Sequence, residues 1–181
     1  LQENSSTYTG DHAITFGGAN SSTNPVTAPT VTDKTAAAVN LGTATTMTFT
    51  AGVATGSMTL YHVESALITA SATGITASSG GDRLSVAVSP SVGSKFTVSL
   101  TSPQTSGQSF TGTNTLTAYD TWGNVATAFN AATNNITVTS SLTGTISGLT
   151  GTNKLNNASD FTNGVSSIAG LTFSGNAGTG T

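Results

Sequence analysis

Charge is the property that this sequence has least of. Only 6% of the 181 residues are charged, against about 25% in an ordinary globular protein. The cations are scattered, and they are Lys34, Arg83, Lys95 and Lys154. Binding to nucleic acid or to anionic lipid needs clustered Lys and Arg. The composition therefore argues against both as partners.

Cysteine is absent altogether. A disulfide-stapled fold and a thiolate metal site are therefore excluded. No run of eighteen apolar residues occurs, so the sequence predicts no membrane-spanning helix. No signal peptide is visible at Leu1, which suggests a mature chain or a fragment of a longer one.

The residues that abound are Thr, Ser, Gly, Ala and Asn. Only four prolines are present, and a disordered chain would usually contain more proline and more charge. Thr, Val and Ile suit a pleated, half-buried surface. The composition thus favours β-strands with a Thr-rich outer face and a thin apolar inner face.

Apolar and polar residues alternate with a period of two in many short runs, and helical periodicity is absent. Turn residues separate these runs, for example Gly80-Gly81-Asp82 and Asn163-Gly164. This pattern predicts an all-β sandwich. The clearest alternating runs are Met58–His62, Leu84–Val88, Phe96–Leu100 and Ile136–Val138.

An internal repeat is visible. The segment Met47–Ser57 matches Leu171–Thr181, and His12–Phe16 matches Asn134–Val138 more weakly, so one repeat spans about 120 residues. The repeat predicts two modules, 1–90 and 91–181. We expect the first to lack its opening strands and the second its closing strands.

Several of these segments resemble the bacterial Ig-like (filamin-type) tandem repeats of prokaryotic surface proteins. Leu116–Thr127 is similar to the second strand and following turn of such a repeat, and Thr46–Tyr61 and Leu84–Pro90 are similar to its later strands. The resemblance implies tandem immunoglobulin-like sandwiches that serve as stalks or spacers.

Few residues suggest a chemical site. Asp120 is the one candidate for a cation loop, but calcium needs six to eight oxygens, so a tight turn is the preferred interpretation. Trp122, the only tryptophan, suggests a core or module-interface role, or a ring that stacks on sugars. His12 and His62 are the only imidazoles, and two ligands fall short of a zinc site.

We expect no enzymatic activity, no catalytic residues and no cofactor. Neither a nucleophile–base arrangement nor a converging carboxylate pair can be recognised. A Lys–Asn isopeptide crosslink would need one of Lys34, Lys95 and Lys154, and no pattern selects a partner for it. The N-x-[ST] pattern marks Asn4, Asn20, Asn135 and Asn157 as glycosylation candidates, although several such matches arise by chance in this composition.

The hypothesis for function is a structural subunit of an extracellular filament or cell-surface layer. Unfinished sandwiches expose strand edges, and strands from neighbouring subunits would complete them. The expected partner is the chain itself, with glycans as a further possibility. The alternatives are a carbohydrate-binding adhesin module and a spacer from a longer surface protein. The strand residues expected between subunits are Phe96, Val98, Leu100, Leu116, Met58, Leu60, Leu84, Val86 and Val88.

Overall fold

The computed structural model describes residues 6–181, and within them the protein is all-β. Every strand ladder is antiparallel. The only helical elements in this part of the chain are two short 3₁₀ turns, η1 (Gly80–Asp82) and η2 (Ala158–Asp160). No helix in the described part is long and apolar enough to cross a membrane. The all-β class predicted from the alternation is confirmed.

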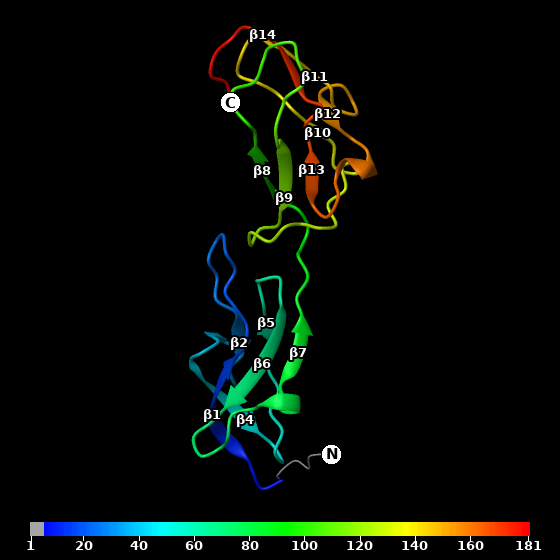
Figure 1. Cartoon of the computed structure of the whole chain (residues 1–181). Coiled ribbons are helices and arrows are strands. Elements are labelled where there is room, and N and C mark those ends of the chain that lie inside the picture. Colours follow the sequence, from blue (N-terminus) through cyan, green and yellow to red (C-terminus); the bar gives the residue numbers. More distant parts are fainter. Residues whose placement is uncertain (1–5) are drawn as a thin grey trace. The chain divides into compact units, whose positions relative to one another are not determined.

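The chain divides into two compact units (Figure 1). The first comprises Leu1–Ser89 with Trp122–Asn124, and the second comprises Pro90–Thr121 with Val125–Thr181. The division falls where Ser89-Pro90 interrupts the alternation, and proline removes a ladder hydrogen bond at such a position. Each unit has buried apolar residues of its own.

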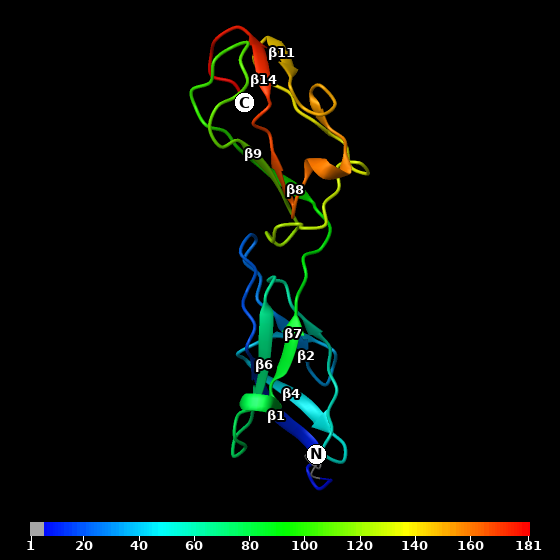
Figure 2. The ribbon, with the colours of Figure 1, turned by 45° about the vertical axis from the view of Figure 1, so that its right-hand side comes forward.

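The first unit contains two sheets. Strand order is β4-β1-β6-β7 in one sheet and β3-β2-β5 in the other. Figure 2 shows β6 and β7 running side by side, and their ladder begins with Ser65 opposite Ala87 and ends with Ile68 opposite Leu84. The strands of this unit are β1 (Gly10–Gly17), β2 (Thr30–Thr32), β3 (Ala38–Asn40), β4 (Ala44–Phe49), β5 (Met58–Thr59), β6 (Ser65–Ser71) and β7 (Leu84–Ala87).

Alternation explains which side chains of the first unit are buried. In β4, Thr45 and Met47 are buried while Ala44 and Thr48 are exposed. The apolar core consists of Ile14, Val31, Met47, Ala66 and Ile68, each at most 7% exposed. Residues of both sheets contribute to it, as expected for a two-layer sandwich.

The second unit has three small sheets, with strand orders β13-β9-β8, β11-β14 and β10-β12. Its core is larger and includes Leu116 and Ala118 of β9 together with Ala126, Ala131, Leu155, Phe161 and Ile168. The strands are β8 (Lys95–Ser99), β9 (Thr115–Tyr119), β10 (Ile136–Thr137), β11 (Gly144–Ser147), β12 (Lys154–Leu155), β13 (Val165–Ser167) and β14 (Thr172–Gly175).

Buried polar side chains secure the long loop between β8 and β9. The Asn114 side chain is 1% exposed. Its Oδ1 accepts a hydrogen bond from the Thr101 backbone N–H at 2.8 Å, and its Nδ2 donates to the Thr111 carbonyl at 3.1 Å. A buried amide whose oxygen and NH₂ both have hydrogen-bond partners holds the loop in one conformation with little net desolvation penalty.

Candidate interaction surfaces

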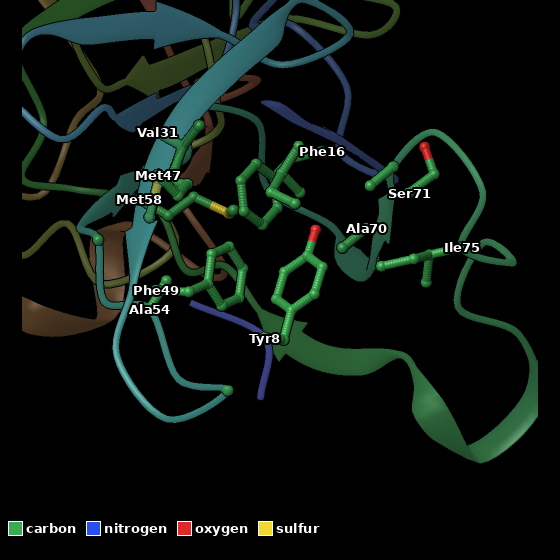
Figure 3. Close-up of a pocket in the computed structure, with 14 residues that line it drawn as sticks. Tyr8, Phe16, Val31, Met47, Phe49, Ala54, Met58, Ala70, Ser71 and Ile75 are labelled. Carbon is green, nitrogen blue, oxygen red and sulfur yellow. The ribbon is translucent and has the colours of Figure 1, made fainter. Parts of the chain in front are cut away.

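An apolar groove opens between the two sheets of the first unit. Its volume is about 680 Å³, roughly four and a half times the 150 Å³ of a cavity that holds one benzene molecule. Figure 3 shows the rings of Tyr8, Phe16 and Phe49 turned toward the same space. The other lining side chains include Ile14, Val31, Met47, Met58 and Ile75, and none of the described residues that line the groove is charged.

Both sheets supply the walls of this groove. Ile14 and Phe16 come from β1, and Met47 and Phe49 come from β4. Val31 of β2 faces it together with Met58 of β5, its direct partner in the ladder. The aromatic rings pack against one another. The ring centroid of Tyr8 lies 4.8 Å from that of Phe49 in an edge-to-face arrangement, and 3.9 Å from that of His12 in a stacked arrangement. The walls are therefore fixed by contacts of their own.

Strand β5 forms the rim of the groove. It is the last strand in the order β3-β2-β5, and it ends a sheet that is only three strands wide. An edge strand presents backbone N–H and C=O groups that can pair with another chain. A strand added beside β5 would extend this sheet over the groove.

The second unit has a groove of its own, of about 660 Å³. Its walls include Val98, Leu100 and Leu116 from the β8–β9 region, and Leu171 and Phe173 from the C-terminal part. Val98 is 60% exposed and Leu100 46%. Phe96 is 42% exposed and is held in its own unit by edge-to-face contact with Phe129 at 5.2 Å.

The internal repeat relates the walls of the two grooves. Ile14, Met47 and Phe49 occupy the repeat positions of Ile136, Leu171 and Phe173. In the second unit, Ile136 and Leu155 pack in one cluster with Leu116 and Ala118 of β9. In the first unit, Ile14, Met47 and Phe49 line the groove.

The structure places the other strand residues expected between subunits in different settings. Leu116 is a core residue, only 5% exposed, so it is unsuited to direct contact with a second chain. Leu84 is 64% exposed on β7, an edge strand. Leu60, Val86 and Val88 are half-buried.

The ionisable candidates do not converge on one site. Nowhere in residues 6–181 do three His, Asp or Glu side chains gather as metal ligands would. Asp120 is buried, and its Oδ2 accepts the Ser91 backbone N–H at 3.0 Å, while Gly123 has φ of +83°. His12 Nε2 donates to the Thr9 carbonyl at 3.0 Å, and His62 Nδ1 lies 4.0 Å from Glu64 Oε2.

Lys34 forms an ion pair with Asp11 in the first unit. The hydrogen bond from Lys34, followed by that from Thr48, lowers the pKa of Asp11, and the same contact with Asp11 raises the pKa of Lys34. Both side chains are more than 40% exposed. The residue beside the Lys34 amine is thus a carboxylate and not the asparagine that a Lys–Asn crosslink would need.

The glycosylation candidates differ in their surroundings. Asn4 lies outside the described residues. Asn20, Asn135 and Asn157 are exposed. The Asn20 side-chain Nδ2 already donates to Glu64 Oε2 at 2.6 Å, and its backbone N–H donates to Glu64 Oε1 at 2.7 Å.

Trp122 belongs to the first unit, where its ring centroid lies 4.4 Å from that of Tyr61. Tyr8, Tyr61, Tyr119 and Trp122 are all half-buried. None of the four is a fully exposed ring of the kind that the carbohydrate-binding hypothesis expects.

Sequence reasoning expected an unfinished module to expose strand edges and an apolar groove, but it did not say which residues would line that groove. The repeat offered the signal, because it showed which strands one module has and the other lacks. Comparison of the chain with protein-family models, with curated proteins and with solved structures finds no match.

Proposed function

We propose that this protein is a structural subunit of an extracellular filament or cell-surface layer, and that it assembles through strand edges of unfinished Ig-like modules. The observation that carries the proposal is the pair of apolar grooves. Each is comparable in volume to a small-molecule site, which is about 300–1,000 Å³. Neither groove is lined by a cluster of ionisable side chains.

A partner that covers an open apolar wall is stabilised by the apolar surface that it removes from water. Covering a Leu, Met or Phe side chain contributes about 1.5–3 kcal/mol. Contiguous exposed apolar surface in a soluble protein marks an interaction site. Phe16, Phe49 and Met58 are already half-buried, so a partner that covers them together with Ile75 would gain a fraction of that amount from each, before it loses its freedom of motion.

Backbone pairing suits this surface better than charge attraction. The groove walls are uncharged, and only 6% of all residues are charged. Electrostatic steering is correspondingly weak. Hydrogen bonds along an edge strand would supply orientation, and alternate side chains would fill the groove.

Light scattering after size-exclusion chromatography, over a range of concentrations, tests the proposal. We expect species whose masses are multiples of 17.8 kDa, the mass of one chain, with larger species at higher concentration. Electron microscopy of the largest fraction should show fibres or sheets. A chain that stays at 17.8 kDa throughout would overturn the proposal and leave a spacer as the remaining hypothesis.

A further inference from the structure

We infer that strand β8 pairs with β8 of a second copy of this chain, edge to edge and antiparallel, with Val98 of each copy on a two-fold axis. The inference rests on the proposed function and names one of its strand edges. The contact joins identical surfaces, and neither copy has to unfold to make it.

Strand β8 is an open edge in the described part of the chain. It ends the order β13-β9-β8 and, with five residues, it is the longest edge strand of the second unit. The first unit has one longer edge strand, β4, but the Thr46 carbonyl of β4 already accepts the Lys34 N–H at 2.9 Å. An open edge strand presents unpaired N–H and C=O groups to another strand.

The hydrogen bonds of β9 show which residues of β8 face the open side. The Ala118 N–H donates to the Gly164 carbonyl at 2.8 Å, so the backbone groups of Ala118 point away from β8. Ala118 is opposite Phe96, and backbone groups alternate in direction along an antiparallel strand. The N–H and C=O groups of Phe96 and Val98 therefore point away from β9. Those of Leu100 follow the same alternation.

The same three residues have exposed apolar side chains. Phe96 is 42% exposed, Val98 60% and Leu100 46%. Phe96 lies opposite Ala118 and Val98 opposite Leu116, and both partners are core residues. The apolar row thus belongs to the inner face of its sheet and is uncovered at the edge. Phe96–Leu100 contains no proline and no charge, which are devices that keep a strand edge from pairing.

A second copy fits this edge because the strand is its own complement. In an antiparallel pair centred on Val98, Val98 faces Val98 and Phe96 faces Leu100, so outward backbone groups meet outward groups at each position. A register shifted by one residue would place them opposite groups that already point to β9. A register shifted by two residues would leave an apolar side chain opposite Ser94 or Ser102.

Charge does not oppose this pairing. Lys95 is the one charged residue of β8, and in the register centred on Val98 it lies opposite Thr101. The two lysines are then six residues apart along the paired strands, or roughly 20 Å at about 3.4 Å per residue. That separation exceeds the Debye length of about 8 Å at physiological salt, so their repulsion is screened.

The contact closes on itself. It uses the same surface on both copies, so it produces a dimer, and growth beyond the dimer needs a different edge, such as β5. A standard interface buries about 800 Å² on each partner, and a single strand edge with three apolar side chains offers less. We therefore expect a dimer that dissociates on dilution.

Substitutions of opposite charge at Val98 test the contact in the full-length chain. On the two-fold axis, Val98→Asp places two carboxylates opposite each other, and Val98→Lys places two ammonium groups there. Each variant should self-associate at least about thirtyfold more weakly than the unaltered chain, because like charges face each other in an apolar contact. An equimolar mixture of the two variants places a carboxylate opposite an ammonium group and should recover a dimer of twice 17.8 kDa. Sedimentation velocity over a range of concentrations measures the dissociation constants.

The matched controls are Val92→Asp and Val92→Lys. Val92 is an apolar residue that is 84% exposed and precedes β8, so the same changes of charge fall outside the strand. Both controls should dimerise like the unaltered chain. Val98 is exposed as well, so its variants should fold, which circular dichroism and thermal unfolding would verify.

Each outcome has one meaning. Loss of the dimer in both Val98 variants and its recovery in their mixture support the inference. If both Val98 variants assemble like the unaltered chain, or if their mixture stays monomeric, the inference is wrong and the proposed function stands. If the unaltered chain forms this dimer and nothing larger at any concentration, the inference stands and the proposed function fails. A chain that is monomeric at every concentration overturns both.

Discussion

Truncating two equally buried side chains should cost different amounts, because one lies in a closed core and the other forms a groove wall. Leu155 and Met47 are each 3% exposed. Leu155 is enclosed in the core cluster of the second unit, whereas Met47 lines the open groove of the first. Truncation of a buried Leu or Met to Ala costs about 2–5 kcal/mol, and the cost rises with the cavity left behind.

We expect Leu155→Ala to lower the free energy of unfolding of its unit by about 3–4 kcal/mol and Met47→Ala by about 2 kcal/mol. The space vacated by Leu155 would be a closed cavity. That vacated by Met47 would merge with a groove that water reaches already, so most of the cavity penalty would be absent. The dilute protein should be used, since a second chain in the groove would enclose Met47.

Native-state amide hydrogen exchange provides the assay, because it reports the opening of each unit separately. Protection should fall in β9, β12 and β13 for Leu155→Ala and in β1, β4 and β6 for Met47→Ala. Changes in separate cores are expected to act independently. A cost for Met47→Ala equal to that for Leu155→Ala would refute the reasoning, and so would a loss of protection in the unaltered unit.

Three further predictions concern the first unit. Gly18→Ala should destabilise the first unit far more than Gly10→Ala. Both glycines have φ near +90°, which costs about 1–2 kcal/mol for alanine, but only at Gly18 would the new Cβ collide, because it would lie 1.9 Å from the Leu67 carbonyl oxygen. Equal shifts in the thermal unfolding midpoint of the two variants would contradict this. Glu64→Gln should cost about 1–3 kcal/mol, because Gln presents an NH₂ to one of the two Asn20 donors, and faster exchange of the Asn20 amide would report it. The pKa of Asp11 is lowered mainly by Lys34, so the ion pair stabilises the fold at pH values above the ordinary carboxyl pKa, and this contribution is lost as the pH falls through the lower pKa of the folded state. Lys34→Met should therefore raise the pKa of Asp11 in a carboxyl NMR titration. The difference in this pKa between the variant and the unaltered chain should shrink in high salt.

The sequence allowed the all-β class to be predicted, because alternation within a strand is a local property. The runs at Phe96–Leu100 and Leu84–Val88 became β8 and β7, and the turn signal Asn163-Gly164 corresponds to two residues with positive φ. The run at Met58–His62 shortened to the two residues of β5. Strands of two or three residues, such as β12 and β13, carry too little alternation to be recognised.

Pairing and burial were beyond sequence reasoning. Alternation places Val98 and Leu116 on inner faces but cannot say that one is 60% and the other 5% exposed, because exposure depends on which strands cover them. The burial of polar Asn114 and Asp120 depends on partners in distant loops. The grooves likewise arise where two sheets diverge, and no short segment of sequence encodes that.

Disulfide trapping tests the central claim most directly, and the chain has no cysteine to interfere. One chain would carry Thr97→Cys and a second would carry Ser99→Cys, two positions of β8 that face each other in the register centred on Val98. Their Cα atoms would lie about 4.5 Å apart, a separation that a disulfide can span. Ala38→Cys on β3, an edge strand of the first unit, is the matched control. The account predicts that under mild oxidation Thr97→Cys and Ser99→Cys form a crosslinked heterodimer and that Ala38→Cys forms none with either. No crosslink between the two β8 positions, or equal crosslinking through Ala38→Cys, would contradict it.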